Sequence, residues 1–350
     1  MKNFFSTRWG IIVVGAVIGI LATLLQKFGN PANMGICVAC FARDTAGALG
    51  FHHAGNLQYV RPELIGIILG SLVMALIFKE FKPRGGSATI VRFFLGIFAV
   101  IGALVFLGCP WRASLRLAGG DWNAIVGFAG LIGGIYIGTL FIKKGYNLGR
   151  SMPSNKKLSG WIFPASMIIL LILLVFGFKK LANANPPHAL LWISLGFALI
   201  IGALAQRSRF CTVGAFRDMM MIGESYLLTG LGTFIVVAFI MNLLLGQFHP
   251  GFANQPAAHT MHLWNFLGMV LAGLAFTLAG GCPGRQLVMA GEGDSDAAIF
   301  FLGLIVGAGL AHNFGLTSSG KGIGEFGAAG TIIGIIFCLI IGFTMVQKRK

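Results

Sequence analysis

Long apolar runs separated by short polar segments extend along the whole chain. A helix that rises about 1.5 Å per residue crosses about 30 Å of hydrocarbon in roughly 20 apolar residues. We therefore expect an all-α polytopic membrane protein with about ten spanning helices. No convincing small-x-small cleavage site follows the first run, so we interpret it as a membrane helix rather than a signal peptide. The runs cover approximately residues 9–26, 62–78, 91–108, 124–142, 161–178, 189–205, 227–245, 264–279, 297–314 and 328–346.

The composition agrees with a chain that lies in a bilayer. Hydrophobic residues make up 56% of the chain and charged residues only 10%, whereas soluble domains carry about 25% charged residues. The 52 glycines fit helices whose backbones approach one another closely in lipid. We therefore expect no soluble domain.

Basic residues are unevenly distributed between the two sets of loops. The chain has 26 Lys and Arg residues against 10 Asp and Glu residues, and its formal net charge is +16. With ten spans, 18 of the basic residues fall on the side of both termini and 8 on the opposite side. The positive-inside rule then predicts cytoplasmic N- and C-termini. Because the excess lies mainly in short loops beside apolar helices, it requires no nucleic-acid partner.

A Gly-Cys-Pro-x-Arg motif occurs twice, each time at the end of an apolar run. It places Cys109 in "FLGCPWRASLRLAGGD" and Cys282 in "LAGGCPGRQLVMAGEGD", 173 residues apart. In both copies an Asp follows twelve residues after the Cys, at Asp121 and Asp294. We expect these two Asp residues to be helix N-caps rather than proton carriers.

A second motif, Cys-x5-Arg-Asp, recurs at nearly the same offset. "CVACFARD" contains Cys37 and "CTVGAFRD" contains Cys211, 174 residues apart. Two motifs in the same order with offsets that agree to one residue predict an internal duplication. We divide the chain into a first membrane repeat, residues 1–160, and a second, residues 161–350.

The period of the duplication predicts how the two repeats lie in the membrane. It contains five spans, and an odd number of spans makes the second repeat start on the opposite side. The repeats are then inverted, and short re-entrant helices that carry the Cys motifs approach the centre from opposite faces. Such an arrangement is a common plan of transporters.

The residues around the motifs favour an anionic ligand. Pro110 and Pro283 follow their cysteines directly, and proline is preferred at the first position of a helix. The helix N-terminus offers unpaired N–H groups and the positive end of the helix dipole to an anion. Arg112 and Arg285 lie in the same first turns. Other polar side chains that could support binding near the motifs are Arg43, Arg217 and Gln286.

Thiols along a pathway favour a soft solute. A thiol is a polarizable contact and a weak hydrogen-bond donor, so it suits a solute with terminal sulfur or selenium better than one with only hard oxygens. A thiolate would repel an anion, and we expect apolar burial to keep these thiols protonated. Sulfate would gain little from such a path.

At the level of whole motifs, the chain resembles a known family. "GICVACFARD", "RFCTVGAFRD" and the two Gly-Cys-Pro-x-Arg segments resemble the YeeE/YedE family of sulfur-compound membrane transporters, over essentially the whole chain. The longer "MGICVACFARDTAGALGF" further resembles the YedE branch associated with selenium metabolism. The resemblance implies a transporter rather than an enzyme.

The resemblance also carries expectations about location and partners. It implies an hourglass-shaped inverted-repeat protein of the bacterial inner membrane that takes up thiosulfate or a related sulfur or selenium anion. It implies handover to a TusA-like cytosolic sulfur carrier protein as well. We expect no cofactor and no metal site.

The resemblance assigns the pathway to particular thiols. These are Cys37, Cys109 and Cys282, with Cys211 as the symmetry mate of Cys37. Cys40 departs from the internal symmetry and is considered separately, as is Cys338 in the last apolar run, for which we expect a packing role.

Cys40 is open to three interpretations, because its counterpart in the second repeat is Gly214. It could serve the selenium branch, form a redox pair with Cys37 in a Cys-x-x-Cys motif, or fill space. A lone Cys-x-x-Cys is weak evidence for redox chemistry, and we favour packing.

Two other classes of function are weighed against transport of a sulfur anion. A membrane thiol-disulfide oxidoreductase could use Cys37 and Cys40, but the symmetric motifs approach from opposite faces, which suits passage better. A soft-metal transporter is opposed by the scarcity of carboxylates and by the arginines beside the thiols. No Walker, Rossmann or hydrolase motif is present.

Overall fold

The computed structural model describes residues 4–149, 151–154, 158–177 and 186–347. Within this part of the chain, ten helical segments are long and apolar enough to cross a membrane. They coincide with the ten apolar runs, so the prediction of an all-α polytopic membrane protein is confirmed. The long helices are α1 (Arg8–Lys27), α3 (Pro62–Ile77), α4 (Thr89–Phe106), α6 (Asn123–Lys143), α7 (Leu158–Val175), α8 (Leu191–Ser208), α10 (Tyr226–Leu244), α11 (His262–Ala279), α13 (Ser295–Asn313) and α14 (Gly327–Thr344).

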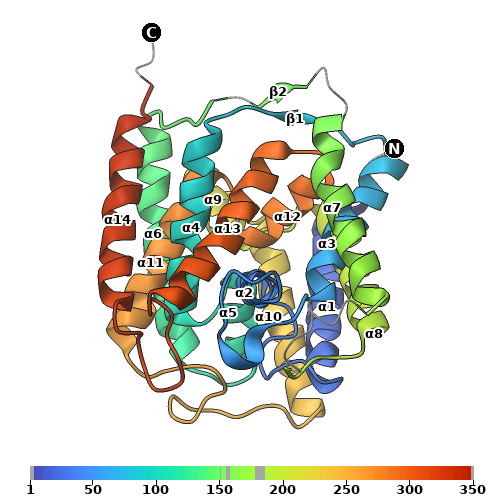
Figure 1. Cartoon of the computed structure of the whole chain (residues 1–350), viewed down its shortest axis with the longest axis vertical. Coiled ribbons are helices and arrows are strands. Elements are labelled where there is room, and N and C mark those ends of the chain that lie inside the picture. Colours follow the sequence, from blue (N-terminus) through green and yellow to red (C-terminus); the bar gives the residue numbers. More distant parts are fainter. Residues whose placement is uncertain (1–3, 150, 155–157, 178–185, 348–350) are drawn as a thin grey trace.

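Four short helices lie inside the bundle of long helices. They are α2 (Val38–Ala48), α5 (Pro110–Ala118), α9 (Thr212–Ile222) and α12 (Pro283–Gly291). In Figure 1, α2 and α5 lie in the lower half of the molecule and α9 and α12 in the upper half. The remaining described elements are the 3-10 helices η1 (Phe4–Ser6) and η2 (Gly55–Leu57) and the antiparallel strands β1 (Arg84–Gly85) and β2 (Met152–Pro153).

The first and last described residues lie at the same end of the molecule, the upper end in Figure 1. We call this end the terminal end and the opposite one the distal end. The terminal end also carries β1 and β2. The short helices α9 and α12 therefore lie on the side of the termini, and α2 and α5 lie on the side away from them.

The helices follow one another in the same order in the two halves of the chain. The short helices α2 and α9 have 11 residues each, and α5 and α12 have 9 each. Packing is equivalent too: α1 packs on α10 and α8 on α3, and α4 packs on α13 and α11 on α6. A division at residue 160 falls inside α7, which has the same place in the order as α14. The exact division of the chain into two repeats stays a prediction.

Glycines allow the closest contacts between these helix pairs. A Cβ atom on Gly70 of α3 would lie 2.0 Å from the carbonyl oxygen of Leu199 in α8. In the equivalent pair, a Cβ atom on Gly15 of α1 would lie 2.3 Å from the carbonyl oxygen of Gly230 in α10. The abundance of glycine thus has the structural use that the composition predicts, because any side chain at these positions would separate the helices.

The two Asp residues that follow the Gly-Cys-Pro-x-Arg motifs have different roles. Asp294 caps α13 and accepts hydrogen bonds from the backbone N–H groups of Asp296 (3.0 Å) and Ala297 (3.1 Å). Asp121 lies one residue before Trp122, the N-cap position of α6, and its Oδ1 accepts a hydrogen bond from the backbone N–H of Asn123 at 3.0 Å. Its other oxygen, Oδ2, pairs with Arg116 at 2.5 Å, and both side chains are fully buried. The expected N-cap is therefore found for Asp294, whose other oxygen pairs with Arg84 at 2.7 Å. Asp121 accepts from the first N–H of α6 but lies one residue before the N-cap position.

Arg116 fastens the end of α5 to the end of α4. Its Nη1 donates to the carbonyl oxygen of Phe106 at 2.6 Å, and its guanidinium lies 4.1 Å from the centre of the Phe106 ring. The last residue of α4 and the last turn of α5 are thereby held together. This contact sets the hairpin that carries Cys109 between the two helices.

Candidate functional site

Cys37 and Cys211 are the N-cap residues of α2 and α9. The Cys37 sulfur accepts a hydrogen bond from the backbone N–H of Cys40, and the Cys211 sulfur accepts one from Gly214, both at 3.2 Å. Each sulfur thus replaces the side-chain oxygen that usually caps a helix. This cap role, which the sequence analysis did not predict, fixes where each thiol lies.

Cys109 and Cys282 occupy the equivalent position at the start of α5 and α12. The Cys282 sulfur accepts a hydrogen bond from the backbone N–H of Arg285 at 3.4 Å. Pro110 and Pro283 are the first helical residues, so the prediction that these cysteines lie at helix N-termini is confirmed.

In each half the two motif cysteines face the same helix terminus. The Cys109 thiol lies next to the backbone amides of Val38 and Ala39, which begin α2. The Cys282 thiol lies next to the amide of Thr212, which begins α9. The structure therefore forms a first thiol cluster (Cys37, Cys40, Cys109) and a second thiol cluster (Cys211, Cys282).

The second thiol cluster is joined by direct contacts. The backbone N–H of Cys282 donates to the Cys211 sulfur at 3.4 Å, and the two thiols are hydrogen-bonded to each other. Cys282 is fully buried, whereas Cys211 is 6% exposed. Cys211 is therefore the more solvent-accessible of the two cysteines.

Cys37 and Cys40 are paired as a disulfide, with their Cα atoms 5.3 Å apart. The sequence analysis favoured simple packing for Cys40, and the structure differs. The reason is local: a cap residue and the residue three positions later lie on the same side of the first helical turn. Arg112 adds a contact, since its Nη1 lies 3.3 Å from the Cys40 sulfur. The redox state of this pair therefore decides whether the Cys37 thiol is available.

The arginines of the Arg-Asp pairs are neutralised by their neighbours. Arg43 lies 2.7 Å from the Asp44 carboxylate, and Arg217 lies 2.8 Å from that of Asp218. Asp44 also binds Arg61 at 2.7 Å. These pairs lie in the middle of α2 and α9, and the charges of Arg43 and Arg217 are compensated there.

The arginines of the Gly-Cys-Pro-x-Arg motifs differ from each other. Arg285 forms an ion pair with Glu292 at 3.1 Å. Arg112 has no carboxylate partner within the described part of the chain: its Nε donates to the carbonyl oxygen of Asn33 at 3.2 Å, and its Nη2 has no partner. Gln286 is fully buried and donates to Ala279 at 3.1 Å. The uncompensated charge near the thiols is therefore that of Arg112.

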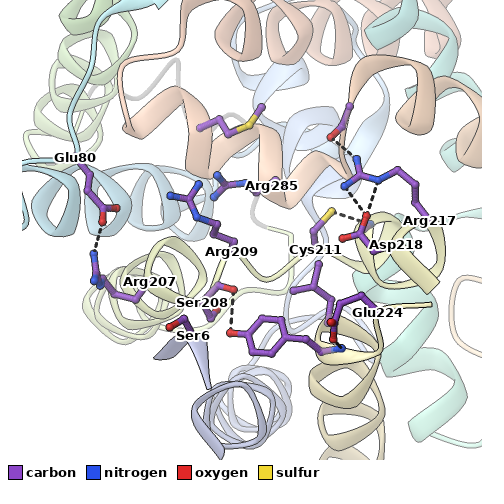
Figure 2. Close-up of a pocket in the computed structure, with 15 residues that line it drawn as sticks. Ser6, Glu80, Arg207, Ser208, Arg209, Cys211, Arg217, Asp218, Glu224 and Arg285 are labelled. Atoms are coloured by element: carbon purple, nitrogen blue, oxygen red, sulfur yellow. Dashed lines mark hydrogen bonds and ion pairs between the residues drawn. The ribbon is translucent and has the colours of Figure 1, made fainter. Parts of the chain in front are cut away.

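A cavity of about 380 Å³ opens at the terminal end and reaches Cys211. Its volume lies within the range of small-molecule sites, about 300–1,000 Å³. We call it the vestibule. In Figure 2 the Cys211 side chain lies between the labelled arginines Arg209, Arg285 and Arg217. The vestibule thus leads from the terminal end to the second thiol cluster.

Cations outnumber carboxylates in the vestibule. Four arginines and three carboxylates line it, the arginines being Arg207, Arg209, Arg217 and Arg285. Of these, the side chain of Arg209 makes no hydrogen bond or ion pair with any described residue, although its charge acts on Glu80. An anion that enters the vestibule would meet this free guanidinium before it meets the thiols.

Glu80 organises one wall of the vestibule. It accepts hydrogen bonds from Gln206 at 2.7 Å and from Arg207 at 3.0 Å. Burial alone would raise the pKa of Glu80, but these hydrogen bonds and the charges of Arg207 and Arg209 outweigh it and lower the pKa. Glu80 is therefore ionised at neutral pH, and it holds Arg207 away from the centre of the vestibule.

The second half of the chain matches a family by sequence. Residues 207–345 match the family described as Sulphur transport. The matched segment covers less than half of the chain. The segment contains the second thiol cluster and most of the residues that line the vestibule. The first thiol cluster precedes it in the chain.

Two curated proteins are similar to parts of this chain. The thiosulfate transporter TsuA of Spirochaeta thermophila is 30% identical over 117 residues, which are 33% of this chain and 35% of that protein. The thiosulfate transporter TsuA of Escherichia coli is 33% identical over 142 residues, 38% of this chain and 39% of that protein. The chain thus matches little more than a third of the length of each relative. The predicted family resemblance is confirmed, and its selenium branch stays a prediction.

Three residues near the thiols were not predicted from the sequence. Trp111 and Phe210 are fully or almost fully buried beside the cysteines, and Arg209 lies in the vestibule. Alignment of the two Gly-Cys-Pro-x-Arg motifs could have singled out Trp111, because its counterpart is Gly284. Arg209 has Gly35 at the corresponding position, so the repeat gave no signal for it.

Cys338 is separate from the two thiol clusters. It lies in α14, at the edge of the molecule in Figure 1, and is fully buried where α14 packs on α4 and α11. Its surroundings agree with the packing role that the sequence predicts.

Proposed function

We propose that this chain moves a small sulfur-containing anion across the membrane, with thiosulfate as the leading candidate substrate. The observation that carries the proposal is the meeting of four helix N-termini, each capped by a cysteine, at the centre of a membrane protein. Helix N-termini favour anions, and thiols favour a soft terminal sulfur. The names of the two relatives support the same substrate.

In this proposal the anion passes from the first thiol cluster to the second and leaves through the vestibule. Cys37, after reduction of its bond to Cys40, contacts the sulfur end of the anion first. Cys109 and Cys282 follow, and Cys211 passes the anion to the vestibule. Arg112 compensates the negative charge near the first cluster, because it has no carboxylate partner among the described residues. Arg209 does so in the vestibule.

The test of the proposed function is uptake by the purified protein in lipid vesicles. Radiolabelled thiosulfate should accumulate in vesicles with the protein and not in empty ones. Excess unlabelled thiosulfate should compete, and sulfate should compete poorly because its outer atoms are all oxygen. Equal competition by sulfate would contradict the thiol pathway, and lack of any thiosulfate uptake would contradict the proposed function.

Two further parts of the proposal concern a selenium substrate and a partner protein. The "MGICVACFARDTAGALGF" segment supports a selenium species as an alternative substrate, which the same vesicles would test with labelled selenite. A vestibule that ends at Cys211 leaves room for handover to a TusA-like sulfur carrier on the terminal side. The oxidoreductase alternative is not favoured, because both relatives carry the name of a transporter.

The proposed orientation places both termini and the vestibule in the cytoplasm, with the protein in a bacterial inner membrane. The excess of 18 over 8 basic residues on the side of the termini supports it. Reporters fused after Lys350 or inserted near Asn155 should read cytoplasmic, and one inserted near Gln247 should read external. A reversed pattern of all three would invert entry and exit.

A further inference from the structure

The two Gly-Cys-Pro-x-Arg motifs differ at the variable position, which is Trp111 in one and Gly284 in the other. The structure brings these two residues together. A Cβ atom on Gly284 would lie 2.4 Å from Cζ2 and 2.6 Å from Cη2 of Trp111. The Trp111 ring therefore lies directly on the backbone of the first turn of α12, where only glycine leaves room for it.

A second contact holds the same ring against α9. The centres of the Trp111 and Phe210 rings are 6.1 Å apart, and Phe210 in turn packs edge-on against Phe234 at 6.2 Å. Phe210 directly precedes Cys211, and Trp111 follows two residues after Cys109. One side chain of the first half thus touches both helix starts that carry the second thiol cluster.

The indole of Trp111 has an unused hydrogen-bond donor. The side chain is 1% exposed, and its Nε1 has no hydrogen-bond partner among the described residues. Buried Trp N–H groups usually find a partner, and a buried donor without one is costly. Two neighbouring residues also have unpartnered polar atoms, Nη2 of Arg112 and Oγ1 of Thr212. Three buried polar atoms beside the motif cysteines thus have no partner among the described residues and are available to an anion.

We propose that Trp111 is the central gate of the pathway and that its N–H donates a hydrogen bond to the anion as it moves between Cys109 and Cys282. This proposal rests on the proposed function. The apolar ring separates the two clusters, so water and small solutes cannot pass until it moves. The N–H group can only donate, and it therefore selects a solute with a free acceptor. The ring face favours the weakly hydrated sulfur end of such an anion over a fully hydrated oxyanion.

The gate is tested by thiol labelling, which does not require transport. In membrane vesicles of both orientations, a variant with Cys211 as its single cysteine reports which side the vestibule faces. From that side, an impermeant thiol reagent should react slowly with a variant that retains only Cys109. Adding Trp111→Ala should raise this rate about tenfold or more, since a barrier lowered by 1.4 kcal/mol gives a factor of ten. Trp111→Phe keeps a ring and should leave the rate slow.

The role of the Trp111 N–H group as a hydrogen-bond donor is tested by thiosulfate uptake. These variants retain all six cysteines. Trp111→Phe should lower uptake about tenfold, because a hydrogen bond to a charged group contributes at least about that factor in affinity. Trp122→Phe is the matched control: Trp122 is 43% exposed, so its replacement should leave uptake unchanged.

The contact between the Trp111 ring and Gly284 allows a test of whether the variants fold correctly. Gly284→Ala should lower the Tm in detergent, and Trp111→Ala should remove most of that effect because the two residues are in contact. This cycle shows whether the variants retain the local structure.

The labelling and uptake results distinguish a failure of the Trp111 gate from a failure of the proposed thiosulfate transport. Equal labelling of Cys109 with Trp111 and with Ala at this position would overturn the gate, and unchanged uptake by Trp111→Phe would overturn the donor. If the wild-type protein takes up no thiosulfate, the proposed function fails, and the labelling comparison still decides whether the ring is the barrier.

Discussion

Cys109→Ala and Cys282→Ala are each expected to bring thiosulfate uptake close to that of empty vesicles, whereas Cys338→Ala should remain near the wild-type rate. The two motif thiols lie at the N-termini of α5 and α12, where the anion is proposed to pass. Loss of a hydrogen bond to a charged group weakens binding by about 1.5–3 kcal/mol, about ten- to hundredfold. Cys338 is buried in the peripheral α14, which packs on α4 and α11 rather than on the short helices that carry the motif cysteines.

A serine variant distinguishes the two roles of a motif cysteine, the thiol contact with the anion and the N-cap of the helix. Cys282→Ser preserves a side chain that accepts the N–H of Arg285, because serine is a preferred N-cap. It should therefore fold as the wild type, with the same Tm, and still transport poorly, since a hydroxyl is a harder contact for sulfur. Full activity of Cys282→Ser would mean that the residue serves only as a cap.

The disulfide between Cys37 and Cys40 predicts that a reductant changes uptake. If the pathway uses the Cys37 thiol, wild-type uptake should rise after treatment with dithiothreitol, because Cys37 and Cys40 are paired in the structure. Cys40→Ala frees Cys37 permanently, and its uptake should not respond to the reductant. A response that persists in Cys40→Ala would place the redox-sensitive step elsewhere.

Asp121→Asn should lower stability by about 3–5 kcal/mol, the usual effect of leaving one charge of a buried ion pair without its partner. The Arg116 and Asp121 side chains are both fully buried, so water cannot replace the lost carboxylate. Asp218→Asn is the matched control. Its pair with Arg217 is 27–28% exposed, and exposed pairs contribute about 0–1 kcal/mol. Thermal unfolding in detergent measures the difference.

Replacing both partners tests the cause of this effect. Asp121→Leu with Arg116→Met removes both charges, and the double variant should lose less stability than Asp121→Asn because no unpaired charge remains. Equal loss in the double variant and in Asp121→Asn would assign the effect to packing rather than to charge.

The spanning helices and the starts of α5 and α12 could be predicted because their signals are local. An apolar run of sufficient length needs little tertiary context, and a proline fixes the first turn of a helix. The thiols of Cys109 and Cys282 were therefore placed correctly at helix N-termini. The position of Asp121 was predicted only approximately, because α6 begins one residue later than α13 relative to the motif and places Trp122 at the N-cap.

Contacts between the halves could not be predicted from the motifs. The ring of Trp111 meets Gly284 across 173 residues of chain, and the sequence shows only that the two positions differ. The pairing of Cys37 with Cys40 was left open for a related reason: the spacing permits a bond, and only the cap conformation of Cys37 brings the sulfurs together. Arg209 belongs to the vestibule only because α8 ends there in a left-handed residue, with a φ of 57°.

The contact between Trp111 and Gly284 bears on how such a protein could arise from two copies of one ancestral half. Two identical halves would place either two indoles or two glycines at the meeting point. Two indoles would collide, since even a methyl group on Gly284 would overlap the ring, and two glycines would leave a hole. Fusion into one chain allows the two positions to diverge, so that one half supplies a large side chain and the other supplies the space for it. A homodimer of the first half could not reproduce this centre, however well its helices packed.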